Sequence, residues 1–323
     1  MKTVTAIAAF SLAGLLLLFT AAAFAQSYPA KPIRFLVGFA PGGTNDIVAR
    51  KLAEKLTDGM GQPVIVENRP GANTAIATEL VARAAPNGYT ILLNAPGHAT
   101  NAALMKLSFD PIRDFAFVSL AVEAQNVLIV HPSFPPKSVK ELIAFSKRRP
   151  GEINYASGGT GSSLHLSAEL FQFMAGVKWV HVPYKGGVPA AVELIAGQTS
   201  FMFGNLPTVI QYVRDGKLRA VAVTGGKRSA AAPDIPTVAE SGIPGYEVTN
   251  WFGVAAPAKT PRDIVDRLHG EIVRALNLRD LRDSITSQGA EPVGNTPGQF
   301  TEFVQNEIIK WGKVIHAAQI KGE

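Results

Sequence analysis

The stretch Ile33-Arg34-Phe35-Leu36-Val37-Gly38-Phe39 runs into Ala40-Pro41-Gly42-Gly43-Thr44-Asn45-Asp46, and a helical pattern follows from Ile47 to Leu56. An apolar run, a glycine turn and a polar helix start predict a strand, a loop and a helix. Two consecutive glycines let the backbone turn its amides toward one point, while the helix leaves its first N–H groups unpaired at the positive end of its dipole. The loop is therefore a candidate anion site.

A similar loop recurs later in the chain, as Tyr155-Ala156-Ser157-Gly158-Gly159-Thr160-Gly161-Ser162-Ser163. In open α/β sheets, ligands lie beyond the carboxyl ends of strands, where both loops are expected. One such loop alone is equally well explained as a tight turn whose side chains cap the helix. Two equivalent loops favour ligand contact across a cleft. The expected ligand-binding residues are Gly42, Gly43, Thr44, Asn45 and Asp46 in the first loop and Ser157, Gly158, Thr160, Ser162 and Ser163 in the second.

Length and composition narrow the class of protein. The 323 residues exceed what one hydrophobic core usually supports, so two domains are expected. The chain has no cysteine, which excludes disulfides and thiolate metal sites. Its formal charge of +6 mildly favours anionic solutes, but the basic residues are scattered, and we expect no nucleic-acid partner.

The N-terminal segment reads as an export signal. Lys2 precedes an apolar segment, Ala6 to Phe19, and then Ala23-Phe24-Ala25, a small-x-small cleavage pattern. The apolar part falls short of the roughly 20 residues that a membrane-spanning helix needs, which argues against an anchor. We expect residues 1–25 to be a signal peptide that is cleaved after Ala25. Export of a chain without cysteine points to a bacterial periplasm.

The rest of the chain alternates strands and helices twice, which predicts two α/β lobes with mainly parallel sheets around a central ligand cleft. Two long apolar stretches, near residues 115–130 and 246–256, are expected to cross between the lobes. Lobe 1 would then hold residues 26–124 and 252–323, and lobe 2 residues 125–251. Ala95 to Asn101 is expected to be a polar loop, and the last helix, Pro297 to Ala318, is expected to pack on lobe 1.

Catalytic and metal sites find little support. The chain has no Gly-x-Ser-x-Gly elbow, and Ser162 or Ser163 near His165 fits helix capping better than nucleophilic catalysis. His165 and Glu169 share a helix face, but no partner motif completes a metal site. Tyr184 and Asn205, at strand ends, are either neutral hydrogen-bonding groups for a ligand or structural residues, and Lys185 is either an anion contact or a solvated lysine.

Several motifs resemble one family, the solute-binding proteins of tripartite tricarboxylate transporters, known as the Bug family. The resemblance covers essentially the whole chain after residue 25. It rests on Tyr28-Pro-x-Lys-Pro-Ile-Arg, Phe39-Ala-Pro-Gly-Gly through Asp46, Val66-Glu-Asn-Arg-Pro-Gly, Ala85-Pro-Asn-Gly-Tyr-Thr, Leu142 to Ala156, His165-Leu-x-x-Glu-Leu-Phe, His181-Val-Pro-Tyr-Lys-Gly, Asn205-Leu-Pro, Arg219-Ala-Val-Ala-Val-Thr, Pro236-Thr-Val-Ala-Glu and Trp251-Phe-Gly.

The resemblance implies a type II periplasmic-binding-protein fold that closes on a small carboxylate, held by the loops at Gly42 to Asp46 and Ser157 to Ser163, and delivers it to a membrane permease. It implies no catalysis, cofactor or metal, and we expect a monomer. The family often has aspartate just before the asparagine, where this chain has Gly204; the missing acid favours a plain carboxylate over an amino acid. A ligand sensor that signals to a membrane partner and an exported serine hydrolase are the alternatives.

Overall fold

The first lobe is built on a parallel sheet, as expected from the alternating pattern. The structure is a computed structural model that describes residues 28–321, so the expected signal peptide and its cleavage point lie outside the described residues. The strands are β1 (Ile33–Val37), β2 (Val64–Asn68) and β3 (Thr90–Asn94), and β1 pairs in parallel with both others. Their connections hold α2 (Thr44–Met60), the 3-10 turn η1 (Ala72–Thr74), α3 (Ala75–Ala82) and α4 (Gly97–Leu104).

The second lobe repeats this arrangement. Its strands are β5 (Asn154–Ser157), β6 (Val180–Pro183), β7 (Phe201–Asn205) and β8 (Arg219–Val223), and β5 pairs in parallel with β6 and β7. Its helices are α5 (Val139–Arg148), α6 (Ser163–Ala175), α7 (Gly187–Ile195) and α8 (Leu206–Arg214). Both lobes therefore place helix starts at the carboxyl ends of parallel strands.

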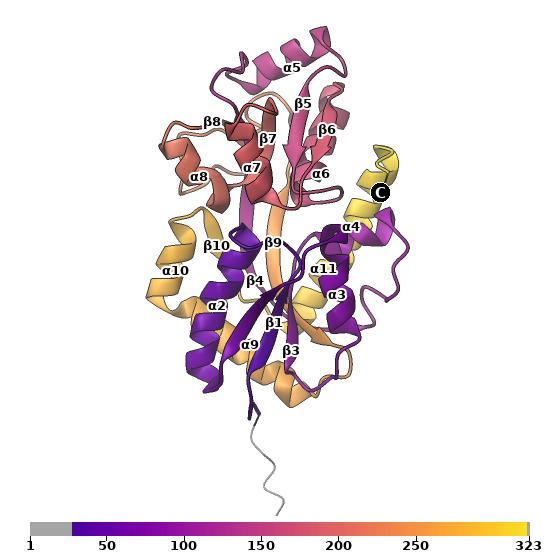
Figure 1. Ribbon diagram of the computed structural model, residues 1–323, viewed down its shortest axis with the longest axis vertical. Coiled ribbons are helices and arrows are strands. Elements are labelled where there is room, and N and C mark those ends of the chain that lie inside the picture. The colour runs from indigo at the N-terminus through magenta and orange to yellow at the C-terminus, as the bar shows by residue number, and fades with distance from the viewer. Residues whose placement is uncertain (1–27, 322–323) are drawn as a thin grey trace, which may run out of the picture.

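Two long strands, β4 (Phe115–Val130) and β9 (Thr249–Pro257), run between the lobes where the sequence predicted crossings (Figure 1). They pair antiparallel, and β4 continues past β9 to pair with β7 and β8 of the second lobe. The described strands form one ten-stranded sheet in which every antiparallel pair involves β4 or β9, including the pairing of the short β10 (Ala290–Pro292). The parallel parts belong to the lobes and the antiparallel part to the hinge.

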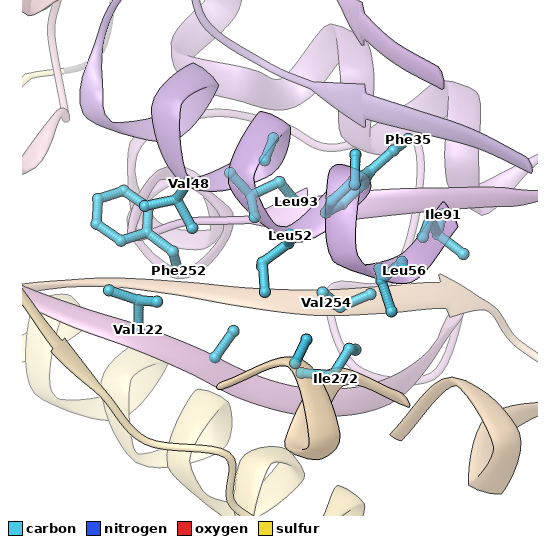
Figure 2. Close-up of a cluster of buried hydrophobic side chains, with 14 of the residues drawn as sticks. Phe35, Val48, Leu52, Leu56, Ile91, Leu93, Val122, Phe252, Val254 and Ile272 are labelled. Atoms are coloured by element: carbon cyan, nitrogen blue, oxygen red, sulfur yellow. The ribbon is translucent and has the colours of Figure 1, made fainter. Parts of the chain in front are cut away.

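The first lobe's core explains why its opening segment folds as it does. Val48, Leu52 and Leu56 lie on one face of α2 and are nearly fully buried, as the spacing predicted. They pack on β1, β3 and the hinge strands, and α9 (Arg262–Asn277) and α10 (Arg279–Thr286) contribute to the same cluster (Figure 2). The glycine loop after β1 is thus anchored on both sides by buried elements.

The last helix, α11 (Pro297–Ala317), begins with a capping box between Thr296 and Gln299. Phe300 and Val304 pack in the first lobe, as predicted, but Trp311 and Ile315 belong to a hydrophobic cluster built mainly from the second lobe. A helix of 21 residues is about 31 Å long, so it extends beyond one lobe and reaches the other (Figure 1).

The expectation of a polar loop at residues 95–101 is wrong, because α4 begins at Gly97. The sequence pattern does not indicate this helix, because its polar side chains point inward and it has no apolar stripe. Asn101 donates to the carbonyls of Ala72 and Asn73, and Thr100 donates to the carbonyl of Gly161 at 2.9 Å. These buried contacts replace the hydrophobic pattern that usually identifies a helix.

His98 on α4 makes stability depend on pH. Its side chain is buried among Phe109, Phe115 and Phe117, and burial lowers its pKa from 6.5 to about 4, although the carbonyl of Pro111 lies 2.6 Å from Nε2. The pKa of His98 is lower in the folded than in the unfolded chain. Its contribution to the free energy of unfolding is therefore fully present above about pH 6.5 and is lost as the pH falls toward 4. His98 alone accounts for about 3 kcal/mol of this loss.

We predict that His98→Gln, which keeps a donor for the carbonyl of Pro111, reduces the fall in urea-unfolding stability between pH 6.5 and 4 by about 3 kcal/mol. Part of the fall remains, because the buried His165 also has a lowered pKa. The exposed His316→Gln serves as the control and should retain the slope of the unchanged protein. An equal slope in all three proteins would contradict the assignment.

Candidate functional site

The two glycine loops face each other between the lobes, next to the hinge strands (Figure 1). They enclose a small cavity of about 30 Å³, which we call the inner cavity. That volume holds about two water molecules or one carboxylate group. Its lining comes from both lobes and the hinge: Phe39, Ala40, Gly43, Asn45, Ala95, Pro96, Gly97, Gly158, Ser162, Ser163, Leu164, Gly186, Gly187, Val188, Pro189, Asn205, Thr208 and Asn250.

Five helices begin at the inner cavity: α2 and α4 from the first lobe, and α6, α7 and α8 from the second. Of these, only α6 has a side-chain cap, in which Ser162 Oγ accepts from the amide of His165. The first N–H groups of a helix have no partner inside the helix, so the other four starts leave donors available. At α4 the amides of His98 and Ala99 bond to the carbonyls of Ala95 and Pro96, which leaves that of Gly97. Five positive dipole ends and these donors make the cavity a site for an anion.

None of the described residues that line the inner cavity carries a charge. An anion there is held by backbone amides and neutral side chains, without a cationic partner. The lining also lacks a carboxylate, so a ligand's ammonium group would find no counter-ion. The site therefore suits an anionic group that brings no positive charge with it.

A second space adjoins the inner cavity, and we call it the outer compartment. It measures about 560 Å³ and shares Phe39 and Gly158 with the inner cavity. Asn73, Thr160 and Tyr184 contribute to its wall, and Lys185 is the one charged residue in its described lining. A ligand larger than a single carboxylate has room to extend here.

The carboxylate of Asp46 stabilises the first loop through hydrogen bonds. Its carboxylate accepts from the amide of Gly42 at 3.0 Å, from Arg50 at 2.9 Å and from Asn68 at 3.0 Å. Burial opposes ionisation, but the hydrogen bonds from Arg50, Gly42 and Asn68 outweigh it and lower the pKa of Asp46. All these partners are protein groups, and Asp46 lines neither the inner cavity nor the outer compartment, so its carboxylate holds Gly42 in place.

The serines of the second loop also serve mainly to shape it. Ser157 is fully buried and pairs with His181, while Ser162 donates to the carbonyl of Gly159 at 2.7 Å. The amide of Gly161 donates to Nδ1 of His165 at 3.1 Å, so that nitrogen is occupied. Ser162 and His165 thus form a helix cap and a loop brace.

Position 204 faces away from the inner cavity, so the glycine there does not determine the choice between a plain carboxylate and an amino acid, contrary to the prediction. Asn205 lines the inner cavity and donates to Asn126 Oδ1 at 2.6 Å, and neighbouring residues of a strand face opposite sides. A side chain at position 204 would meet Val209 at 2.8 Å and Ile129 at 3.3 Å, in the apolar core behind β7. The preference for a plain carboxylate rests instead on the uncharged lining.

Two hydrogen bonds join the lobes directly beside the site. Thr44 Oγ1 on α2 lies 2.6 Å from Thr208 Oγ1 on α8. Thr100 on α4 donates to the carbonyl of Gly161 in the second loop. The structure is therefore the closed form, in which the helix starts of both lobes are within reach of one small ligand.

The predicted ligand-binding residues fall into three groups. Those that line the inner cavity are Gly43, Asn45, Gly158, Ser162, Ser163 and Asn205. Gly158 also faces the outer compartment, together with Thr160 and Tyr184. Gly42, Thr44, Asp46 and Ser157 line neither space, and Thr44 bonds instead to the cavity residue Thr208 across the lobes.

Sequence reasoning missed two loops of the site. Ala95-Pro96-Gly97 and Gly186-Gly187 both follow strands and start helices, so they carry the same signal as the two recognised loops. Thr208 and Asn250 had no comparable signal. Trp251 and Phe252, next to Asn250 on β9, are fully buried core residues and do not line the inner cavity.

Residues 48–320 match the family described as tripartite tricarboxylate transporter family receptor, TctC. The chain belongs to this family. Protein BugT of Bordetella pertussis is 39% identical over 300 residues, which cover 92% of each chain.

Solved structures agree with the assignment. R. palustris Rpa4515 with adipate has a TM-score of 0.89 and 36% identity, covering 92% of this chain and all of that one. MatC from Rhodopseudomonas palustris with bound malate has a TM-score of 0.85 and 33% identity, covering 89% of this chain and all of that one. The fold is that of a bilobed periplasmic binding protein. Within residues 28–321 no helix is both long and apolar enough to cross a membrane.

Gly43 offers a direct test of the site. Its backbone, at φ −80° and ψ 172°, suits any residue, and an added Cβ meets only the carbonyl of Ala40 at 4.0 Å. We predict that Gly43→Val leaves the Tm of the free protein within a few degrees but abolishes stabilisation by carboxylates, because the valine side chain fills the inner cavity. The exposed Gly270→Val is the control and should bind normally. Retained binding by Gly43→Val would show that the loop only turns the chain.

Proposed function

We propose that this protein captures a small carboxylate in the periplasm and delivers it to the permease subunits of a tripartite tricarboxylate transporter. The observation that carries the proposal is the meeting of five helix starts around a cavity with an uncharged lining. Membership of a transporter-receptor family supports the transport role and the choice of a permease as partner. The protein acts as a monomer without cofactor or metal.

The two spaces of the cleft favour a dicarboxylate. The inner cavity, at about 30 Å³, accommodates one carboxylate, and the rest of the ligand passes between Phe39 and Gly158 into the outer compartment. There Lys185 provides the complementary charge for a second anionic group. The adipate and malate of the two similar structures are both dicarboxylates, which supports this choice.

A binding role without catalysis fits the local chemistry better than a hydrolase. Ser162 is engaged as a helix cap, and Nδ1 of His165 accepts from a loop amide. Burial, and then the neighbouring His181, lower the pKa of His165 to about 3, so it is a poor proton acceptor near neutral pH. Ser157 is fully buried and His181 half-buried, and neither lines either ligand space.

The proposed role requires that the protein be exported to the periplasm. Residues 1–25 act as the signal peptide, and cleavage after Ala25 leaves the described fold to begin a few residues later. Mass spectrometry of the protein from a periplasmic extract tests this point, since the expected N-terminal residue is Gln26.

The ligand class is tested by thermal unfolding with mono-, di- and tricarboxylates. A ligand at about 100 times its dissociation constant adds roughly 2.7 kcal/mol of stability. We predict that succinate, malate or adipate raises the Tm, whereas aspartate, which is succinate with an added ammonium group, binds at least about tenfold more weakly because that charge is buried unpaired. Absence of a shift with every anion would refute the binding role, and a clear preference for aspartate would refute the plain-carboxylate assignment.

A further inference from the structure

A groove of about 650 Å³ lies on the back of the hinge, and we call it the hinge groove. One wall is the second-lobe loop Gly225–Ala231 with Glu247, and the other comes from α10 and β10 of the first lobe. Its floor includes Glu123 and Gln125 of β4 and Thr249 of β9. Its volume is that of a small-molecule site.

The hinge groove and the inner cavity lie on opposite faces of the hinge strands. Asn250 lines the inner cavity, whereas its neighbour Thr249 lines the hinge groove. Similarly, Asn126 bonds to the cavity residue Asn205, whereas Gln125 faces the groove. Successive residues of a strand alternate between faces, so the two sites are separated by the sheet itself.

One buried acceptor in the floor of the groove, Gln125 Oε1, lacks a donor within residues 28–321. Gln125 is 9% exposed, and its Nε2 donates to the carbonyl of Lys227 at 3.0 Å. Its Oε1 has no hydrogen-bond partner among the described residues. A buried amide oxygen without a donor is costly unless another group supplies one.

Tandem glycines make room for two of the groove's polar side chains. A Cβ on Gly225 would lie 2.8 Å from Gln125 Oε1, and a Cβ on Gly226 would lie 3.1 Å from Glu247 Oε2. Two adjacent glycines thus make room for the Gln125 amide and the Glu247 carboxylate against the same loop.

Glu123 adds a second carboxylate without a partner. Within residues 28–321 it forms no ion pair, whereas Glu291 pairs with Lys227 at 3.4 Å. Burial, followed by the nearby Glu291, Glu307 and Glu247, raises the pKa of Glu123. The groove's described lining holds three carboxylates, Glu123, Glu247 and Glu291, against two cations, Lys227 and Arg282. Lys227 pairs with Glu291 and Arg282 donates to Asn277 Oδ1, which leaves Glu123 and Glu247 without an ion pair among the described residues.

We propose that the hinge groove binds a small organic cation with primary ammonium groups, held by Glu123, Glu247 and the free oxygen of Gln125. An ammonium group supplies three donors and one positive charge, which matches what these three side chains lack. A flexible diamine fits better than a metal ion, since no group of three or more metal-ligating side chains occurs in the described chain.

The position of the groove couples it to closure. When the lobes part on the cleft face, the two walls behind the hinge approach each other, so an occupant of the groove favours the closed form. If the proposed carboxylate function holds, a bound diamine raises carboxylate affinity, and the carboxylate raises diamine affinity by the same factor.

The site is tested by calorimetric titration of the carboxylate-free protein with putrescine, so that this result does not depend on the proposed function. We expect saturable binding, weakened at least about tenfold in both Glu123→Gln and Glu247→Gln and unchanged in Glu152→Gln, an exposed glutamate outside the groove. Glu247 is exposed, so its variant keeps the test valid if the Glu123 variant folds poorly.

Binding that is absent, that is reproduced by sodium chloride at equal ionic strength, or that is equal in all three variants would overturn the proposal. A second titration, of succinate with and without saturating putrescine, tests the coupling. Tighter succinate binding supports the location across the hinge, and an unchanged affinity with putrescine bound contradicts it.

Discussion

The structure depends on backbone amides that the fold leaves unpaired at the starts of helices. Each helix start contributes only about 0.3 to 1 kcal/mol toward an anion at an exposed site, so one loop alone would bind weakly. Here five starts meet at one cavity from two lobes. Their positive ends repel one another when the lobes close, and a carboxylate between them offsets that repulsion. Binding and closure are therefore aspects of one electrostatic arrangement.

The hinge lets this arrangement form and come apart. Irregularities in the β4–β9 register, between Phe117 and Ser119 and between Leu120 and Val122, interrupt a regular ladder and favour bending there. Glu307 on α11 limits the movement, because it accepts from Trp251 of β9 at 3.0 Å and from Trp311 at 2.9 Å. Since Trp311 packs with the second lobe, α11 links the hinge to both lobes.

The sequence predicted the elements whose signal is local. The apolar stripe of α2, the two glycine loops and the long crossing strands all carry patterns that backbone geometry requires. Sequence patterns failed where tertiary contacts decide, because α4 is held by buried polar side chains that no apolar stripe marks. The prediction that a side chain at position 204 would contact the ligand is wrong for a related reason. The direction of a side chain depends on strand register, which no motif reveals.

The central claim is that uncharged backbone amides from both lobes hold the ligand carboxylate. Amide nitrogen and proton chemical shifts, followed by NMR during titration with succinate, test it most directly. The account predicts large shifts at Gly43, Gly97, Gly158 and Gly187, which come from both lobes and line the inner cavity, and small ones at the exposed Gly270. Saturable binding that leaves those four amides unchanged, or that moves them in one lobe only, would contradict it.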